Sequence, residues 1–476
     1  MKNSNNYQTT RLASRHKNKL QICIEKKYQE LNKKFSYIID NFLSIYEIEF
    51  DIIISFGDDI KSNSKVHIRP GINILDFFSS RKEIPSDYIF KNWRKRKLPF
   101  FFTRNGKKEI ISNLNGKICI NYDILSSSFY LLSCWQEWMS NTNDKLGRFP
   151  AKESFLFKHN LLQIPVVNYY FAILKTAIEK YQKYNQKNKI ISLGSNNISC
   201  LITHDIDKCK TGWKENSARA FIEGHPIVAF KTIFNKIFNK DTWFNFEQIL
   251  YFEEKYNIKS TYFFNPRKSR SRYINNADYE LNSDEMIKIL NKLSNDNHEI
   301  GIHGSFNSGY NKNLLIEDIK NFQLQPIGNR FHFLAFNIPH SYDILELTDL
   351  KYDSSLGFAE KIGFRSGYCY PYKPYDINND KSYTFLEFPL MIMDTTLAKK
   401  KYMNTNYNIA YEFINNIINE VDLFNGTLVV LWHNSYYSGY KYSKWLEILE
   451  FLINKTKLLH SDFKTFSQYM EQTNEY

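Results

Sequence analysis

Apolar residues recur along the first part of the chain with the spacings of both helices and strands. Residues 24–47 carry apolar side chains on one face of a helix, and residues 48–55 (IEFDIIIS) have the apolar run of a strand. Residues 117–121 (KICIN) predict another short strand. Helices with one buried face are expected over residues 123–139 and 166–184, because apolar residues recur there every three or four positions. This part of the chain therefore predicts a small α/β domain.

A polar stretch separates this part from the rest of the chain. Residues 182–189 (QKYNQKNK) hold few apolar side chains and predict a linker. Because 476 residues exceed the usual size of one hydrophobic core, two domains are expected. We expect a flexible N-terminus over residues 1–20, an α/β accessory domain over residues 21–190 and a larger domain over residues 196–476.

The second part repeats a pattern in which a short apolar run stops abruptly at polar residues. Such runs occupy residues 199–203, 259–264, 299–302 and 429–432, and they alternate with helical segments such as 283–294, for which Ser283 is the expected N-cap. Strand–helix alternation favours an α/β fold with a parallel sheet, open or closed into a barrel. Functional groups collect at the carboxyl ends of such strands, and here these ends carry charged residues.

Composition narrows the class of protein. Hydrophobic residues make up 43% and aromatic residues 16% of the chain, which is enough for packed cores. The net charge of +13 could indicate an anionic partner, but the lysines are scattered among many Asn and Ile residues, as in proteins from AT-rich genomes. We therefore expect no nucleic-acid partner.

The absence of membrane, secretion and disulfide signals indicates the cellular compartment. No stretch approaches the roughly 18 apolar residues of a membrane helix, and the N-terminus has no apolar core of a secretory signal. The six cysteines form no CxxC pair, so disulfides and cysteine-based zinc sites are not expected. These features predict a cytoplasmic protein without a transmembrane segment.

The first strand end offers two carboxylates separated by one residue, Asp205 and Asp207. Positions i and i+2 of a strand face the same side, so both can reach one site. Burying two unpaired charges is costly, and a metal or an arginine would resolve the repulsion. A solvent-exposed acidic turn is the alternative.

Other strand ends supply nitrogen donors. His303 follows an apolar pair at the end of residues 299–302, and His433 follows Leu431 and Trp432 at the end of the last apolar run. Neutral imidazole is the commonest nitrogen ligand of zinc-like ions, although a lone histidine at such a position is more often a packed core residue.

Taken together and in order, these motifs resemble the polysaccharide deacetylase (NodB-homology) family over residues 199–470. The resemblance implies a distorted (β/α) barrel of the polysaccharide deacetylase type, preceded by the smaller α/β domain. The N-terminal residues Asp144, Gly147, Arg148 and Phe149 also resemble a region that precedes this domain in some bacterial relatives. The matching segments of the barrel are residues 203–207 (THDID), 298–303 (HEIGIH), Arg330 with 351–356 (KYDSSL), Asp394 in FPLMIMDTT, and 431–433 (LWH).

The resemblance also implies a role for each residue. Asp205 would be the general base, held by Arg330, and His433 the general acid, held by Asp394. Leu431 would line a pocket for the acetyl methyl group, with Trp432 beside it. The metal, a divalent cation and in first place zinc, would be bound by Asp207, His303 and a third residue.

One position departs from the family pattern. The family has a second histidine four residues after the first, and this chain has Asn307 there. Asn307 could bind weakly, His332 or His340 could replace it, or the site could have lost its metal; an amide oxygen is a poorer zinc ligand than imidazole. We favour His332, which lies two residues after Arg330.

The resemblance indicates a hydrolase of carbon–nitrogen (non-peptide) bonds that removes acetyl groups, N-acetyl first, from a bacterial glycan. Without a secretion signal, a lipid- or nucleotide-linked glycan precursor is the expected substrate. The aromatic segment 363–375 could cover the barrel or contact sugar, with Arg365 meeting an acidic group. Two alternatives stay open: a catalytically impaired glycan-binding protein on the same fold, and a hydrolase of another non-peptide C–N bond.

Overall fold

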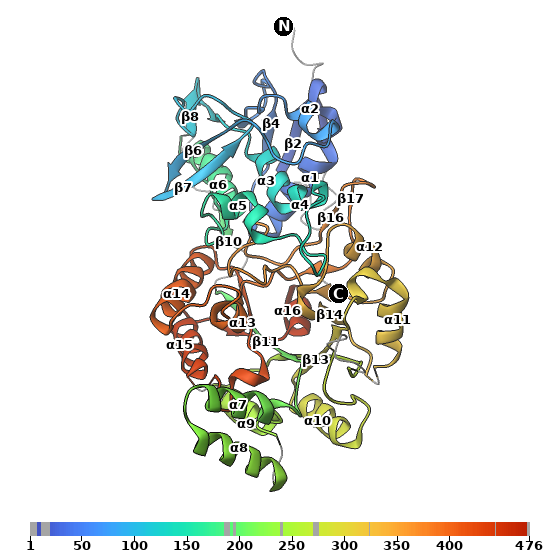
Figure 1. Ribbon diagram of the computed structural model, residues 1–476. Coiled ribbons are helices and arrows are strands. Elements are labelled where there is room, and N and C mark those ends of the chain that lie inside the picture. The colour runs from blue at the N-terminus through green and yellow to red at the C-terminus, as the bar shows by residue number, and fades with distance from the viewer. Residues whose placement is uncertain are drawn as a thin grey trace.

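Each of the two parts of the chain is built around its own β-sheet (Figure 1). The computed structural model describes residues 7–10, 20–184, 191–193, 197–238, 241–269, 276–322, 324–442 and 444–473. Within these residues, no strand of one main sheet is hydrogen-bonded to a strand of the other. We call the described residues from 7 to 193 the N-terminal part and those from 197 to 473 the C-terminal part.

The N-terminal part contains a six-stranded sheet in the order β1–β2–β4–β5–β9–β8. Its four central strands are parallel and its two edge strands antiparallel. The sheet strands are β1 (Tyr7–Thr10), β2 (Leu20–Glu25), β4 (Ile52–Phe56), β5 (Val66–Ile68), β8 (Ile111–Leu114) and β9 (Lys117–Ile120). Two further pairs join β6 (Tyr88–Trp93) to β7 (Arg96–Phe101) and β3 (Tyr46–Ile48) to β10 (Ile191–Leu193). The helices are α1 (Asn32–Ile45), α2 (Ile74–Ser79), α3 (Ile124–Leu132), α4 (Trp135–Met139), α5 (Phe155–Lys158) and α6 (Val166–Tyr184).

Several boundaries in this part differ from the sequence prediction. The helix expected over residues 24–47 starts later, because Leu20–Glu25 is a buried strand that pairs with β4. A 3-10 helix covers Lys26–Leu31, and α1 follows from Asn32. The helix expected over residues 123–139 is split between α3 and α4 at Cys134, whose φ of 52° breaks the helical path. Tyr7–Thr10, expected to be flexible, pairs with β2 as an edge strand. Most of the expected linker lies outside the described residues.

The C-terminal part contains a sheet in the order β18–β15–β14–β13–β12–β11–β20–β19, and every pairing along this path is parallel. The sheet curls, but the strands at its two ends, β18 and β19, are not paired with each other, so among the described strands it forms an open half-barrel. This mixed α/β arrangement fits the barrel that the resemblance implied. The strands are β11 (Ser199–Ile206), β12 (Thr261–Phe264), β13 (Glu299–Gly304), β14 (Gly328–Phe331), β15 (Tyr352–Asp353), β18 (Leu386–Glu387), β19 (Ile392–Met393) and β20 (Thr427–Leu431).

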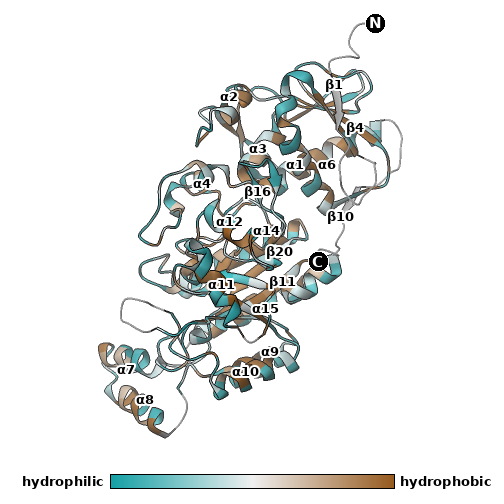
Figure 2. Cartoon of the chain, turned by 90° about the vertical axis from the view of Figure 1, so that its right-hand side faces the viewer, coloured by the Kyte–Doolittle hydropathy of each residue, from teal (hydrophilic) through white to brown (hydrophobic). Residues whose placement is uncertain are grey.

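Helices surround this sheet. They are α9 (Phe246–Lys255), α10 (Asp284–Asn295), α11 (Lys312–Lys320), α12 (His340–Glu346), α13 (Asp394–Ala398), α14 (Tyr407–Leu423), α15 (Trp445–Leu458) and α16 (Phe466–Thr473). A helical hairpin of α7 (Gly212–Ile222) and α8 (Pro226–Phe238) projects from the end of the molecule far from the N-terminal part (Figures 1 and 2). Short strands β16 (Tyr375–Asp376), β17 (Lys381–Ser382) and β21 (Asp462–Phe463) complete the fold.

The predicted alternation of strands and helices is confirmed here, with two local differences. β11 continues past residue 203, so Asp205 lies inside the strand. Ser283 precedes α10, but its side chain makes no capping hydrogen bond and its hydroxyl instead donates to the Glu280 carbonyl. None of the six cysteines, all of which lie in the described part of the chain, forms a disulfide, and all are buried. Among the described residues, no helix combines the length and apolar character that crossing a bilayer would need.

Candidate active site

Neighbouring strands of the parallel sheet deliver polar side chains to one edge. β11 carries Asp205 and leads into Asp207, and β13 carries His303, whose register partner on β14 is Arg330. His433 follows β20 after one residue, Trp432, and β20 pairs with the other side of β11. Because the strands are parallel, their carboxyl ends meet at the same edge, and residues more than 200 positions apart in sequence become neighbours.

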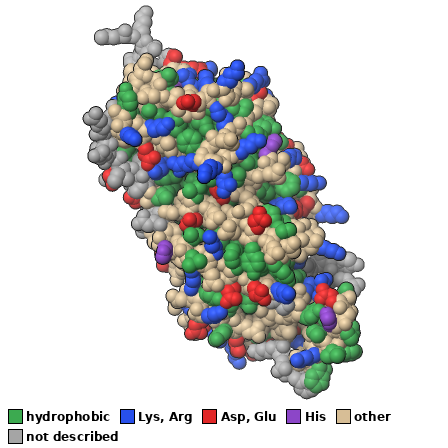
Figure 3. All heavy atoms as spheres, turned by 90° about the vertical axis from the view of Figure 1, so that its left-hand side faces the viewer, with side chains coloured by type: hydrophobic (Ala, Val, Ile, Leu, Met, Phe, Trp, Pro, Cys, Tyr) green, Lys and Arg blue, Asp and Glu red, His purple; other side chains and the backbone are tan. Residues whose placement is uncertain are grey.

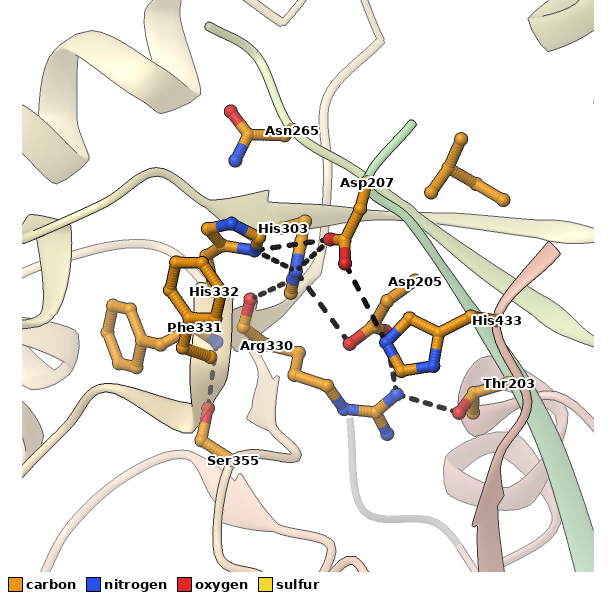
Figure 4. Close-up of polar contacts among 12 residues, drawn as sticks. Thr203, Asp205, Asp207, Asn265, His303, Arg330, Phe331, His332, Ser355 and His433 are labelled. Carbon is orange, nitrogen blue, oxygen red and sulfur yellow. Dashed lines mark hydrogen bonds and ion pairs between the residues drawn. The ribbon is translucent and has the colours of Figure 1, made fainter. Parts of the chain in front are cut away.

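Asp207, His303 and His332 form a compact donor set (Figure 4). Asp207 Oδ1 lies 3.2 Å from His303 Nε2 and 3.2 Å from His332 Nδ1. The two ring nitrogens are 2.9 Å apart. One ligand atom from each residue thus lies within 4.8 Å of the other two.

The chemistry of this set fits a divalent cation. Asp207 Oδ1 is shielded from solvent and makes no well-formed hydrogen bond, although two imidazole nitrogens lie beside it. His303 Nδ1 lies 2.8 Å from the Arg330 carbonyl, so a proton on Nδ1 leaves the Nε2 lone pair directed toward Asp207. Burial acts to raise the pKa of Asp207, but the neighbouring His332 and His303 imidazoles hold it well below its ordinary value. A carboxylate facing two imidazole nitrogens is a ligand set that zinc-type ions accept.

Asp205 is paired with a fully buried arginine. Arg330 Nη1 donates to Asp205 Oδ1 at 3.0 Å and to the Thr203 hydroxyl at 2.7 Å. The rest of the guanidinium donates to the carbonyl and the hydroxyl of Ser354, and it stacks on Phe263 with its central carbon 4.6 Å from the ring centre. Asp205 Oδ2 lies 3.8 Å from His303 Nε2, so the carboxylate adjoins the donor set. These contacts orient Asp205 and offset its charge.

His433 is held by a second carboxylate. Its Nδ1 lies 2.7 Å from Asp394 Oδ1, and its backbone N–H donates to Asp394 Oδ2 at 2.5 Å. Its Nε2 lies 3.8 Å from Asp207 Oδ2. Burial alone would lower the pKa of His433, but the carboxylates of Asp394, Asp207 and Asp205 raise it to about 9. The imidazole is therefore protonated at neutral pH in the absence of a cation.

The three candidates for the third ligand occupy different positions. His332 lies in the donor set, in a short helical turn directly after β14. Asn307 is exposed and adopts a left-handed backbone conformation with φ of 69°. His340 is exposed at the start of α12, where its Nε2 lies 3.2 Å from the Tyr310 carbonyl. Of the two histidines, only His332 lies beside Asp207 and His303.

The residues expected to contact substrate are buried. Leu431 belongs to an apolar cluster inside the half-barrel, and Trp432 is fully buried against Tyr436 and Trp445. Arg365 is 5% exposed, and its guanidinium forms a bidentate ion pair with Glu137 of the N-terminal part. Arg365 thus has a structural partner, and none of its contacts supports the expected substrate-binding role.

Two polar residues near the site were missed by the sequence reasoning. Asn265 follows β12 as Asp207 follows β11, and it is buried close to Asp207 in Figure 4. Its side-chain nitrogen has no hydrogen-bond partner among the described residues. Ser354 holds Arg330 from two sides. The rule that polar residues follow strands could have identified Asn265, whereas Ser354 is recognisable only from its contacts.

Comparisons with known proteins found a family model for the N-terminal part and solved structures of similar fold. Residues 22–183 match the model of a family of unknown function, DUF7033. No curated protein matches the chain.

Solved structures resemble the fold at low sequence identity. A putative polysaccharide deacetylase from Mycobacterium smegmatis is 15% identical with a TM-score of 0.39, and the match covers 59% of this chain and 91% of that one. An allantoinase is 12% identical with a TM-score of 0.37, covering 59% and 92%. The polysaccharide deacetylase Bc1974 from Bacillus cereus is 11% identical with a TM-score of 0.27, covering 57% and 92%. None of these similarities identifies the activity of this chain, which has to be inferred from the side chains of the site.

Proposed function

We propose that this protein is a metal-dependent hydrolase that removes acetyl groups, N-acetyl first, from a bacterial glycan or from a lipid- or nucleotide-linked glycan precursor. One observation carries the proposal. The Asp207–His303–His332 donor set lies at the same strand edge as two oriented acid–base groups, Asp205 and His433. A purely structural ion-pair network would not need a three-donor set beside two separately held proton carriers.

The donor set is the proposed binding site of the cation, with zinc as the first candidate. Two imidazoles and one carboxylate are the protein ligands of several catalytic zinc sites, in which a further position stays open. When bound, such a cation polarises a carbonyl and lowers the pKa of water. The protein's own side chains carry out every other step.

Asp205 is the proposed general base. Arg330 donates to Oδ1 and so orients the carboxylate, and Oδ2 faces the donor set. Asp205 therefore accepts a proton from the attacking water, whose oxygen bonds to the acetyl carbon.

His433 is the proposed general acid. Asp394 holds its ring through Nδ1, which leaves Nε2 directed toward Asp207. His433 donates a proton to the amine nitrogen as the C–N bond breaks, so that acetate and a free amine leave. Leu431 remains the proposed wall for the acetyl methyl group.

Acetate release from N-acetylglucosamine oligomers in the presence of Zn²⁺ tests this proposal. We expect release by the unchanged protein, loss in Asp205→Asn, and no loss in the matched control Asp284→Asn, an exposed carboxylate at the start of α10. Opening of a cyclic amide without acetate release would favour the alternative class of C–N hydrolase. A folded protein that binds no divalent cation would refute the metal-dependent mechanism.

A further inference from the structure

The α7–α8 hairpin presents an unusual set of exposed apolar side chains. Ile222, Ile227 and Ile237 are 79%, 83% and 71% exposed. Phe221 and Phe230 are also exposed, with their rings in edge-to-face contact 5.5 Å apart. On α8, the positions 227, 230, 234 and 237 recur at helical spacing, so they form one continuous apolar face. Contiguous exposed apolar surfaces of this kind mark interaction sites in soluble proteins.

The hairpin that carries this apolar face also has an excess of basic side chains. The hairpin carries Lys214, Arg219, Lys231 and Lys236 against only Glu215 and Glu223. Both acidic residues are already engaged: Glu223 pairs with Arg219, and Glu215 pairs with Lys208 and Lys441. Within the described residues, Lys214, Lys231 and Lys236 take part in no ion pair. Figure 3 shows hydrophobic side chains and Lys or Arg gathered at the lower tip of the molecule, where Figure 1 places the hairpin.

This combination distinguishes among possible partners. Two copies of the same face would bring lysines against lysines, which disfavours self-association. Apolar side chains flanked by lysines instead match a bilayer with anionic headgroups, in which the apolar groups enter the interface and the lysines stay at headgroup level. No described helix could span a membrane, so such an association would be peripheral.

The hairpin is attached directly to the rim of the candidate active site. Gly212 follows Asp207 by five positions. The side chain of Asn434, the residue after His433, donates to the carbonyls of Lys208 and Trp243 at the base of the hairpin. A partner surface bound by α7 and α8 therefore lies next to the strand ends that carry Asp207 and His433.

We propose that the α7–α8 hairpin docks the protein on anionic lipid bilayers and thereby places the site rim at the membrane surface. The docking itself does not depend on the proposed hydrolysis. Combined with that function, it favours a lipid-linked glycan over a nucleotide-linked one as the substrate.

Flotation with two kinds of vesicle tests the docking. One kind is phosphatidylcholine alone, and the other is phosphatidylcholine with roughly 30% of the anionic lipid phosphatidylglycerol. We expect the full chain to float with the anionic vesicles, and 1 M NaCl to weaken the binding because the lysines are screened. The variant Ile227→Ser/Phe230→Ser/Ile237→Ser should lose at least about tenfold in partition coefficient. The matched control Leu347→Ser/Leu423→Ser/Leu458→Ser replaces exposed apolar residues elsewhere and should bind as the unchanged protein does.

Two outcomes would overturn the proposal. One is equal flotation of the hairpin variant and the control variant. The other is a dimer of the unchanged protein, measured by light scattering, that becomes a monomer in the hairpin variant without any vesicle binding. In that case a second copy of the chain covers the face.

An independent set of contacts concerns a loop of the N-terminal part, residues 144–148. Arg148 Nη1 donates to the carbonyl of Phe333 at 2.8 Å, and Arg148 is itself held by Asp144 through its Nε and Nη2. The Tyr310 hydroxyl donates to the Leu146 carbonyl at 2.8 Å. This loop thus contacts the C-terminal part beside the residue that follows His332.

The contacted segment has a strained backbone. Phe333 and Leu334 have φ values of 61° and 52°, in the left-handed region that residues with side chains rarely adopt. The Phe333 ring packs against His332, with ring centres 3.8 Å apart. Such a conformation persists only where its surroundings enforce it, and the Arg148 hydrogen bond is directed at this point.

We infer that Arg148 is a positioning residue, which keeps His332 in the donor set by holding the Phe333 carbonyl. The inference rests on the proposed metal site. Partners that orient a ligand without touching the ion change metal affinity about 10–100-fold. The N-terminal part would then contribute to metal binding without supplying a ligand.

Zinc affinity measured by chelator competition tests this role. Arg148→Ala should weaken binding about 10–100-fold, whereas Arg104→Ala, which removes an exposed ion pair of the same part, should not change it. In a His332→Ala background, Arg148→Ala should have no further effect, because the ligand it positions is gone. A merely structural role would instead give additive losses. If the unchanged protein binds zinc and Arg148→Ala binds it equally, the positioning role is refuted; absence of zinc binding in the unchanged protein would refute the metal site itself.

Discussion

Replacing Arg330 by methionine removes the cation that compensates Asp205 while keeping an apolar side chain of similar length. Arg330 is fully buried and Asp205 is 3% exposed, so solvent cannot take over the role of the guanidinium. The change also leaves the carbonyl of Ser354 and the hydroxyl of Thr203 without a donor. Breaking a buried ion pair by removing one partner typically costs about 3–5 kcal/mol. For a unit of this size, that loss corresponds to a fall in melting temperature of about 6–20 °C.

Thermal unfolding followed by circular dichroism in EDTA measures this loss without any contribution from a bound cation. The exposed pair of Arg104 and Asp87 provides a control: Arg104→Met should leave the melting temperature unchanged. The double variant Arg330→Met/Asp205→Asn should lose less than the two single losses together, because the uncompensated charge is gone. Equal melting temperatures for Arg330→Met and Arg104→Met, or strictly additive losses in the double variant, would refute the reasoning.

Two further predictions concern the candidate site, and a third concerns His67, a buried histidine of the N-terminal part. Asp207→Ala should abolish zinc binding, measured by elemental analysis, whereas Asp205→Asn should retain the ion and lose turnover. Full zinc occupancy in Asp207→Ala would exclude Asp207 as an essential ligand. Asp394→Asn should lower kcat about a hundredfold with unchanged zinc affinity, because its side chain accepts from the proposed acid His433 and from the Thr395 backbone N–H and not from the donor set. Reduced zinc affinity would contradict that division. Burial, together with the charges of two basic neighbours, lowers the pKa of His67 to about 4. The unfolded chain takes up this proton below about pH 6.5 and the folded chain does not. The free energy of unfolding should therefore fall by about 2 kcal/mol as the pH is lowered from 7 to 5. Urea unfolding of His67→Gln should lack this part of the pH dependence, and an unchanged dependence would contradict it.

The sequence by itself determined four strands of the C-terminal sheet, β11, β12, β13 and β20, and where their polar ends lie. Apolar runs that stop at charged residues predicted strands near β11, β13 and β20, because local hydrophobic pattern reports burial directly. Asp205, Asp207, His303 and His433 were chosen on that basis, and the structure brings all four to one edge. Parallel strands leave no other common place for their carboxyl ends.

The tertiary structure alone decided which distant groups meet. Sequence could offer Asn307, His332 and His340 as third donors, but the left-handed turn after β14 places His332 beside Asp207. The tertiary structure likewise pairs Arg365 with Glu137, a contact that the sequence did not reveal. Local patterns specify the face on which a residue lies, whereas contacts between segments depend on sheet register, sheet curvature and the docking of the N-terminal part. These properties arise from the packing of the whole chain, so no short window of sequence contains them.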